Sequence, residues 1–340
     1  GDAFLVALLP VAMRLGEAVN VTGPVSARLA HGLVAYQDTL ATWFPKLFRP
    51  VPIRCDSLQS RTADPRPEGV GCTFSGGVDS FFTFWRGVSP QQPIADYRLT
   101  HALMINGFDQ IVDETGDGYS RDMARVYRPV LAEAGVELLM LASNMKRFRD
   151  AVFPKGVRVL SFGSPLVAGA HALAGLFGRF SLAGHATPAY ADLTPMGSHP
   201  ALDHHLGTDQ LQIIHDAAPA TRWQRIARLS DVPAFRATLR VCTKEPRFDE
   251  ETGAVVNCCA CEKCVRTMIT LDLLGLIDGF PTFPDKQALE RHKAPERIAG
   301  HSMMFLADNY RLARKRDRPD WSAVLEQAIR LQHAAAHKAR

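Results

Sequence analysis

Residues 70–85 read VGCTFSGGVDSFFTFW. An apolar run at 70–74 stops at two glycines, and an apolar segment with helix-like composition follows at 81–85. Paired glycines allow backbone angles that other residues disfavour and let the chain come close to a ligand. The N–H groups of such a loop, together with the N-terminus of the next helix, are suited to binding phosphates. The stretch therefore predicts a strand, a phosphate-binding loop at 75–80 and a helix.

The side chains of this loop fit a nucleotide site. The loop consists of Ser75, Gly76, Gly77, Val78, Asp79 and Ser80, and we expect its backbone N–H groups and serine hydroxyls to meet a polyanion such as phosphate. Because an ionised Asp79 only accepts hydrogen bonds, its role beside phosphates is as a ligand of Mg²⁺. No lysine follows the glycines where a Walker loop requires one, and the dinucleotide fingerprint is absent. The alternative is a glycine turn that only starts a helix.

Strands and helices alternate on both sides of this loop. Strand-like runs occupy 101–105, 136–141 and 180–183, with helical patterns at 121–134 and 166–177. This order predicts an α/β fold with a doubly wound, mostly parallel sheet, which binds ligands at the carboxyl ends of its strands. Asn106, Gly107 and Asp109 end the second strand, where we expect the adenine and ribose. We expect a mainly helical lead-in at 1–66, a nucleotide-binding domain at 67–235, and a metal segment with C-terminal helices at 236–340.

Bulk properties restrict the class of protein. The chain has 340 residues, of which 46% are hydrophobic and 22% charged, with a formal net charge of +4. This is the composition of a globular protein, and the charge is too weak to imply nucleic-acid binding by itself. The apolar run at 4–13 is too short to cross a bilayer and has no basic residues before it, so we expect a core element.

Four of the seven cysteines fall in one short segment, 257–264, which reads NCCACEKC. So dense a set cannot satisfy disulfide geometry, which together with the absence of a secretory signal favours a metal site in a reducing, cytoplasmic compartment. Four thiolates make a closed tetrahedral Zn²⁺ site. The C-x-x-C spacing favours Cys242, Cys258, Cys261 and Cys264 as ligands and leaves Cys259 spare. An iron–sulfur cluster could use the same thiolates.

The sequence SGGVDS after a short hydrophobic strand resembles the PP-loop of the ATP pyrophosphatase superfamily, which includes GMP synthetase, asparagine synthetase and tRNA thiolation enzymes. The resemblance implies that Ser75–Ser80 bind ATP and hold the phosphates that leave as pyrophosphate, with Asp79 and Ser80 also catalytic. Residues 221–226, TRWQRI, resemble the start of the lysine-bearing helix that many of these enzymes use near the phosphates. Arg222 or Arg225 stands in place of that lysine, and we take Arg225 as catalytic.

The cysteine segment resembles the zinc segment of the 7-cyano-7-deazaguanine synthase (QueC) family, with Arg266 two positions after the last cysteine. The resemblance covers roughly residues 70 to 275. Cys259 stands where that family usually has glycine, the interval from Cys242 to Cys258 is longer, and the lead-in has no counterpart. By this analogy the substrate is a small-molecule carboxylate or amide, and the second step uses a nitrogen nucleophile.

Histidines and acids crowd the region after the fourth strand, namely His185, Asp192, His199, Asp203, His204, His205, His215 and Asp216. A single histidine is more often structural than functional, but together they stand on the side of the sheet where ligands bind. We expect Ser198, His199 and Asp203 to contact the substrate. A second metal at His199, Asp203 and His204 is an alternative without a firm spacing rule.

These features predict an enzyme that splits ATP into AMP and pyrophosphate and passes the AMP to a substrate oxygen, with ATP, Mg²⁺ and Zn²⁺ bound. One alternative is a tRNA thiolase of the same superfamily, which needs a basic face and a catalytic cysteine pair. Another is a nucleotide-binding sensor or partner module without turnover. We expect no nucleic-acid or membrane partner and leave open a homodimer.

Overall fold

The computed structural model describes residues 1–108, 117–154, 157, 160–184, 195–216, 220–244 and 247–338, without the side chains of 117–120 and 336–338. The chain forms two compact units. The first comprises Gly1–Ser75 and Phe82–Pro219, and the second comprises Gly76–Phe81 and Ala220–Arg340. These limits do not coincide with the predicted segments, because the lead-in joins the α/β part and the helices after residue 220 join the cysteine segment.

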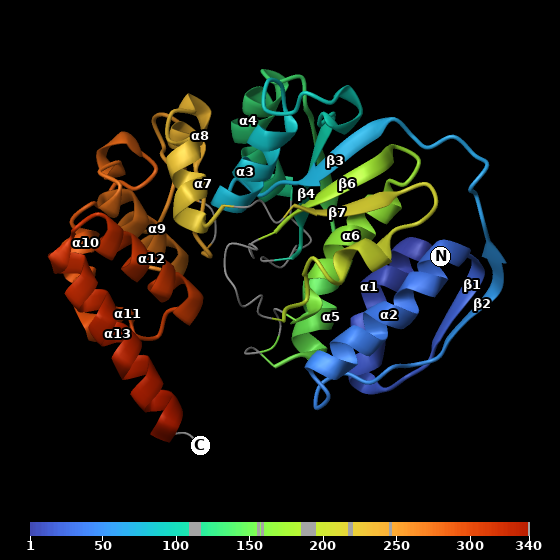
Figure 1. Cartoon of the computed structure of the whole chain (residues 1–340). Helices are drawn as coiled ribbons and strands as arrows, with labels where there is room; N and C mark the ends of the chain where they lie inside the picture. The colour runs from blue at the N-terminus through green and yellow to red at the C-terminus, as the bar shows by residue number, and fades with distance from the viewer. Residues whose placement is uncertain are drawn as a thin grey trace. The chain divides into compact units, whose positions relative to one another are not determined.

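The first unit contains a five-stranded sheet in the order β5-β4-β3-β6-β7 (Figure 1). Each of its four strand pairings is parallel, which confirms a mixed α/β fold with a parallel sheet. The strands are β3 (Gly69–Thr73), β4 (His101–Asn106), β5 (Glu137–Ala142), β6 (Phe177–Ala183) and β7 (Gln212–Asp216). The sequence predicted four of them near these positions. It predicted mostly helix after residue 213 and so missed β7.

Helices in the first unit connect these strands. α4 (Asp117–Ala132) precedes β5, and α5 (Met145–Val152) and α6 (Gly163–Ala172) lie between β5 and β6. Two short 3₁₀ turns, η1 (Ala95–Tyr97) and η3 (Asp203–Leu206), precede β4 and β7. α3 (Val78–Gly87) follows β3 and runs from the second unit into the first.

The lead-in contains two helices and a two-stranded parallel sheet. Its elements are α1 (Asp2–Leu15), β1 (Val19–Ser26), α2 (Ala27–Trp43) and β2 (Ile53–Gln59), with β1 and β2 paired in parallel. α1 buries Leu5, Leu9 and Met13, which confirms the expected core element, and it packs beside α6. In α2, Leu29, Leu33 and Leu40 are fully buried and recur at the spacing of one helix face.

The second unit is mainly helical. Its elements are α7 (Arg222–Leu229), α8 (Pro233–Thr238), β8 (Arg247–Phe248), β9 (Val255–Val256), α9 (Glu262–Leu273), η4 (Ile277–Gly279), α10 (Ala288–His292), α11 (Pro295–Ile298), α12 (Met303–Lys315) and α13 (Pro319–Lys338). Its core includes the fully buried Trp321, Phe235 and Phe280. Among the helices that the structure describes, none has the length and apolar character needed to cross a membrane.

Candidate functional site

The glycine loop between β3 and α3 is a tight turn closed by hydrogen bonds. Gly76 has a φ of +74°, in the left-handed region that favours glycine. Its carbonyl accepts the N–H of Arg240 at 2.8 Å. The carbonyl of Gly77 accepts the N–H of Phe81 at 2.9 Å and the hydroxyl of Ser80 at 3.1 Å. The strand, loop and helix order matches the prediction, while Ser80 directs its hydroxyl to the loop itself.

Asp79, in the first turn of α3, is held by two arginines of the same compact unit. Its Oδ1 lies 2.7 Å from Nη1 of Arg225, and its Oδ2 lies 3.1 Å from Nη1 of Arg222. Arg225 is 1% exposed and Arg222 8%. Arg225 also donates from Nε to the carbonyl of Ala220 at 3.0 Å, and Arg222 contacts the hydroxyl of Thr267 at 3.4 Å. Both guanidinium groups are therefore fixed in direction.

The local sequence of α7 explains why both arginines face Asp79. Thr221 and Gln224 form a reciprocal capping box, in which each side chain accepts the backbone N–H of the other residue. This arrangement fixes the first helical turn at Arg222. Residues three apart lie on the same side of a helix, so Arg222 and Arg225 point the same way. The sequence suggested one or the other arginine, and the structure brings both to one carboxylate.

A third arginine, Arg266 of α9, completes a buried basic group. Its guanidinium lies 3.5 Å from the centroid of the Phe305 ring, and that of Arg222 lies 5.6 Å from the same ring. Its Nη1 is 3.6 Å from Glu262. Burial, and then repulsion from Arg222, lower the pKa of Arg266 to about 9, although Glu262 and Asp79 act in the opposite direction. A bound anion would stabilise the charged form of the Arg266 guanidinium.

The four predicted metal ligands, Cys242, Cys258, Cys261 and Cys264, lie together, with all sulfurs within 4.8 Å of one another. The Sγ–Sγ distances include 3.4 Å for Cys261–Cys264, 3.8 Å for Cys258–Cys264 and 4.0 Å for Cys242–Cys261. A tetrahedral site with Zn–S bonds of about 2.3 Å has sulfurs about 3.8 Å apart, so the set fits zinc. Cys259 is buried outside the set, with its sulfur 3.5 Å from the carbonyl of Asn257.

Asn257 joins the two parts of the candidate metal site, a role that only its position before the cysteines could have indicated. Its Oδ1 accepts the N–H groups of Val241 and Cys242 at 2.9 and 3.1 Å. Its Nδ2 donates to the carbonyls of Leu239 and Thr282 at 2.8 and 3.2 Å. The residue is 1% exposed. The amide therefore ties the segment of Cys242 to the cysteine-rich turn.

In the first unit, the residues predicted to contact substrate form a buried polar cluster around Asp203, which is 0% exposed. The Asp203 carboxylate accepts the Ser198 hydroxyl at 2.7 Å, the His199 N–H at 3.3 Å and Nδ1 of His215 at 2.6 Å. His204 is instead exposed and directs Nδ1 to the carbonyl of Pro200 at 3.1 Å. The alternative second metal at His199, Asp203 and His204 therefore lacks its third ligand.

The lead-in and α6 support this cluster. The ring of His199 packs edge-on against Trp43 of α2, with 4.8 Å between centroids. A Cβ at Gly32 of α2 would meet the carbonyl of His205 at 2.2 Å, and one at Gly163 of α6 would meet the carbonyl of Gly197 at 2.2 Å. Such close backbone approaches require glycine. The two glycines therefore allow α2 and α6 to pack directly against the backbone of the cluster.

The residues expected to read adenine lie at the end of β4. Gly107 has a φ of +92°, and its carbonyl accepts the N–H of Lys146 at 3.0 Å. The carbonyl of Asn106 accepts the N–H of Ser143 at 2.9 Å. These carbonyls therefore already have partners. Ser75 is exposed at the start of the glycine loop.

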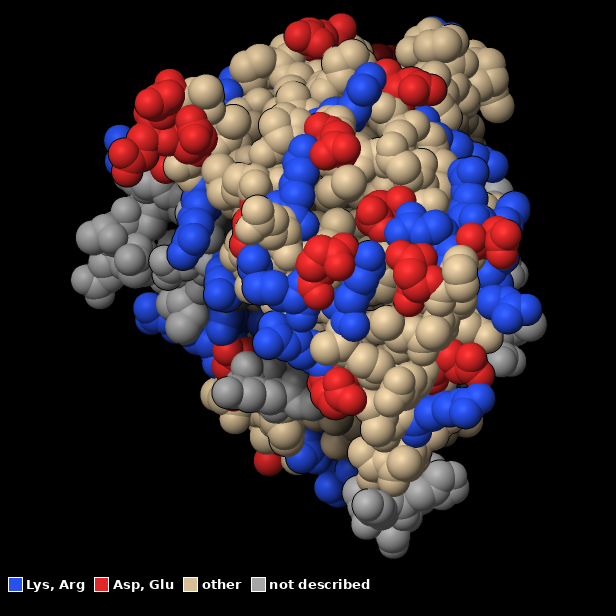
Figure 2. All heavy atoms as spheres, turned by 90° about the vertical axis from the view of Figure 1, so that its left-hand side faces the viewer, with Lys and Arg blue, Asp and Glu red and all other residues tan. Residues whose placement is uncertain are grey.

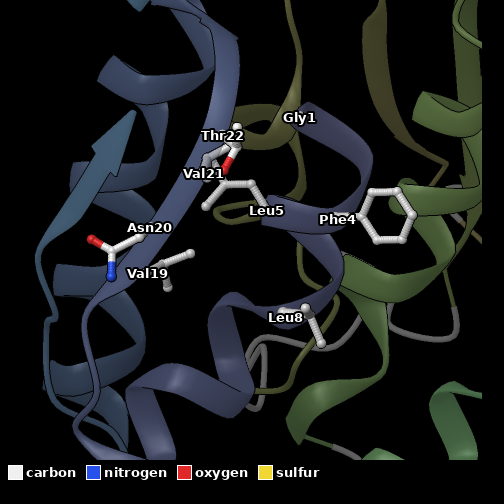
Figure 3. A pocket seen from close by; sticks show the side chains of 8 residues that line it. All are labelled: Gly1, Phe4, Leu5, Leu8, Val19, Asn20, Val21 and Thr22. Carbon is white, nitrogen blue, oxygen red and sulfur yellow. The ribbon is translucent and has the colours of Figure 1, made fainter. Parts of the chain in front are cut away.

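Three residues of the sequence interpretation, Asp109, His185 and Asp192, lie outside the described residues. An apolar pocket of about 400 Å³ opens elsewhere in the first unit, between α1 and β1 (Figure 3). Leu5 and Val21 are among the residues that line it. It contains none of the predicted site residues.

Comparison of the chain with family models, curated proteins and solved structures gives no match. The function must therefore be inferred from the geometry of the site. On the face of the molecule seen in Figure 2, basic side chains are interspersed with acidic ones rather than forming one basic area.

Proposed function

We propose that this chain is an AMP-forming ATP pyrophosphatase of the PP-loop type, with an adenine-nucleotide-binding sheet of doubly wound topology. It would activate a carboxylate or amide oxygen of a small molecule and then allow a nitrogen nucleophile to displace AMP. The resemblance of SGGVDS to the PP-loop and of the cysteine segment to 7-cyano-7-deazaguanine synthases motivates this proposal.

One observation carries the proposal: Arg222, Arg225 and Arg266 gather beside Asp79 at the start of α3. Three guanidinium groups, of which that of Arg266 is only partly buried, share two nearby carboxylates, those of Asp79 and Glu262. Buried arginines of this kind are suited to phosphates, because their planar forks bind anionic oxygens in pairs. The N-terminus of α3 adds backbone N–H groups that favour an anion. The glycine loop and the three arginines belong to the same compact unit. A pyrophosphate site needs both on one side of the phosphates.

In the proposed reaction, a substrate oxygen attacks the α-phosphorus of ATP, and the bond to the bridging oxygen of the β-phosphate breaks. The guanidinium groups of Arg222 and Arg225 stabilise the charge that develops on the departing pyrophosphate. Asp79 keeps both groups in place. When Mg²⁺ is bound with the nucleotide it neutralises phosphate charge, and Asp79 is the loop residue able to bind it.

Zinc has a structural role in this proposal. The cluster of Cys242, Cys258, Cys261 and Cys264 would hold it with four thiolates and no open position, which is the pattern of a structural site. It would fix the turn that leads into α9 and therefore the position of Arg266.

A thiolation enzyme is less well supported. Four of the seven cysteines belong to the metal set. Cys72 is fully buried in β3, and burial raises the pKa of its thiol well above the usual value, which opposes a nucleophilic role. A sensor without turnover has one observation in its favour, since the Asp79 carboxylate is already occupied by two arginines.

Two measurements on the same chain test the proposal. ATP binding is measured by calorimetry with Mg²⁺ present, and pyrophosphate release is measured with a panel of small carboxylic acids and amides. The enzyme is expected to bind ATP and to release pyrophosphate only with an accepted acid or amide. Binding without release, over the whole panel and with a metabolite extract as substrate source, would favour the sensor. Failure to bind ATP contradicts both.

A further inference from the structure

Residues 239–242 connect the glycine loop to the candidate metal site, and we call them the strap. The N–H of Arg240 donates to the carbonyl of Gly76 at 2.8 Å. Two positions further along, Cys242 is one of the four clustered cysteines. Two residues of extended chain span at most about 7 Å, so a short backbone link joins the loop contact to the metal ligand. The strap, the cysteines and Gly76–Phe81 of the loop belong to the same compact unit.

Asn257 holds the strap at both ends. Its Oδ1 accepts the N–H groups of Val241 and Cys242, and its Nδ2 donates to the carbonyl of Leu239 at 2.8 Å. It directly precedes Cys258, a second member of the cysteine set. The strap is therefore bound to the cysteine-rich turn along its length, and its direction depends on how that turn is held.

Two peptide groups carry the contact from Asn257 to the glycine loop. In a trans peptide the C=O and N–H lie in one plane and point in opposite directions. The peptide between Leu239 and Arg240 uses both groups. Its C=O accepts from Asn257, and its N–H donates to Gly76. The next peptide joins Gly76 to Gly77, and because its C=O faces the strap, the N–H of Gly77 points away from the strap.

The N–H of Gly77 is suited to binding an anion. It has no hydrogen-bond partner within the part of the chain that the structure describes, and Gly77 is only half-buried. Gly77 directly precedes α3, and the first N–H groups of a helix have no partner within the helix and favour phosphates. Hydrogen bonds in series polarise one another, so the two bonds from Asn257 through Arg240 make the N–H of Gly77 a stronger donor.

We propose that the strap positions the N–H of Gly77 for a phosphate oxygen of the nucleotide, and that it couples phosphate binding to the metal site. This deepens the proposed function and rests on it. Zinc bound by the four cysteines would hold the turn that contains Asn257, and the strap transmits that order to Gly77. Coupling between two ligands is reciprocal. Phosphate at the loop therefore raises the affinity for zinc by the factor by which zinc raises the affinity for phosphate, and zinc leaves more slowly.

The coupling is measured on the unchanged full chain loaded with zinc, without an acid or amide substrate. Zinc release to a coloured chelator is followed with MgATP in excess magnesium, with adenosine at the same concentration, and without either. We expect MgATP to slow the release at least about fivefold, the lower end of typical couplings between sites, and adenosine to leave it unchanged. Calorimetry on the same sample gives the affinity for MgATP.

The route of the coupling is tested with Arg240→Pro, and Arg240→Ala is the matched control. Both variants remove the side chain, but only proline removes the N–H that donates to Gly76. Leu239, with a φ of −59° and a ψ of 118°, already has a conformation that allows a following proline. We expect Arg240→Pro to keep its zinc, to bind MgATP about tenfold more weakly than Arg240→Ala, and to release zinc at one rate with and without MgATP.

These results separate the coupling from the proposed function. A wild-type chain that binds MgATP but releases zinc at an unchanged rate overturns the coupling and leaves the proposed function in place. Equal MgATP affinity in the folded Arg240→Pro and Arg240→Ala variants also overturns it. If the proline variant does not fold, the release measurement on the wild type still decides. A zinc-loaded wild type that does not bind MgATP contradicts the proposed function, and the coupling fails with it.

Discussion

At the scale of single residues, Asp79 has a different environment from the one its sequence motif suggested. The motif places an acid beside phosphates, which predicts a magnesium ligand. In the structure, each carboxylate oxygen accepts from a separate arginine. Both roles use the same negative charge, that of the Asp79 carboxylate. Asp79 therefore orients Arg222 and Arg225, in addition to any contact with an ion.

Replacing Asp79 with Asn should disable the site. The amide keeps the shape but removes the charge that holds two buried guanidinium groups, so we expect pyrophosphate release to fall about 100-fold or more. Stability should fall by about 1–3 kcal/mol, less than for a fully buried pair because the Asp79 side chain is 24% exposed. Pyrophosphate assays and urea unfolding measure the two effects. Asp231→Asn, an exposed site after α7, is the control, and full activity of Asp79→Asn would falsify the assignment.

Asn257 links, by hydrogen bonds, the segment of Cys242 to the segment of the other three clustered cysteines. In Asn257→Ala, the N–H groups of Val241 and Cys242 and the carbonyl of Leu239 lose their partner, at about 1–3 kcal/mol for each buried group left unsatisfied. We expect a lower melting temperature and faster loss of metal to a chelating dye. Asn20→Ala, at an exposed position of β1, should leave both unchanged. Metal release at the wild-type rate would show that Asn257 contributes to stability but not to metal retention.

At the scale of elements, the turn between β3 and α3 needs a glycine with positive φ and is also the candidate phosphate-binding loop. Gly76→Ala places a Cβ on a residue with φ of +74°, which costs about 1–2 kcal/mol. Gly135→Ala is a matched control, because Gly135 has a φ of +72° with open space around it and lies outside the candidate site. Both variants should lose similar stability in thermal unfolding, but only Gly76→Ala should weaken ATP binding in calorimetry. Equal ATP affinity in the two variants would remove the loop from the site.

Elements that show a local sequence pattern were predictable. Elements whose stability depends on pairing with a distant segment were not. The strand, glycine turn and helix at 69–87 and the cysteine ligands follow from local patterns. The short strand β7 was missed because its burial depends on pairing with β6. The two strands of the lead-in were missed in part for the same reason. They pair with each other, although α2 separates them in the sequence.

The candidate sites were predictable to the same extent. Ser198, His199 and Asp203 lie within six positions of one another and are joined by hydrogen bonds in the structure, while their contact with a substrate stays a prediction. His204 was considered as a ligand of a second metal, yet it lies in the turn η3 and directs Nδ1 to the carbonyl of Pro200. The pairing of Asp79 with Arg222 and Arg225 spans more than 140 positions, which no local pattern reports.

At the scale of the whole molecule, the division into two units has a consequence for the metal. The segment Gly76–Phe81 belongs to the same unit as the four cysteines, although the cysteines are more than 160 positions further along the chain. Zinc in a four-thiolate site stabilises the segment that contains it. Its removal should therefore loosen the glycine loop, while the sheet of the first unit keeps its own buried core.

Hydrogen exchange with mass spectrometry measures this. After treatment with a zinc chelator, we expect faster exchange in residues 242–274, in α7 and in residues 76–81, while β4, β5 and β6 keep their protection. Cys261→Ser should give the same pattern without chelator and contain little metal, because three thiolates cannot close the site. Cys259→Ser should keep its metal and exchange like the wild type, since its sulfur lies outside the set. Faster exchange confined to residues 242–264 would mean that the metal stabilises only the segment that binds it. The positions of Asp79 and its arginines would then depend on the helical core of the second unit alone.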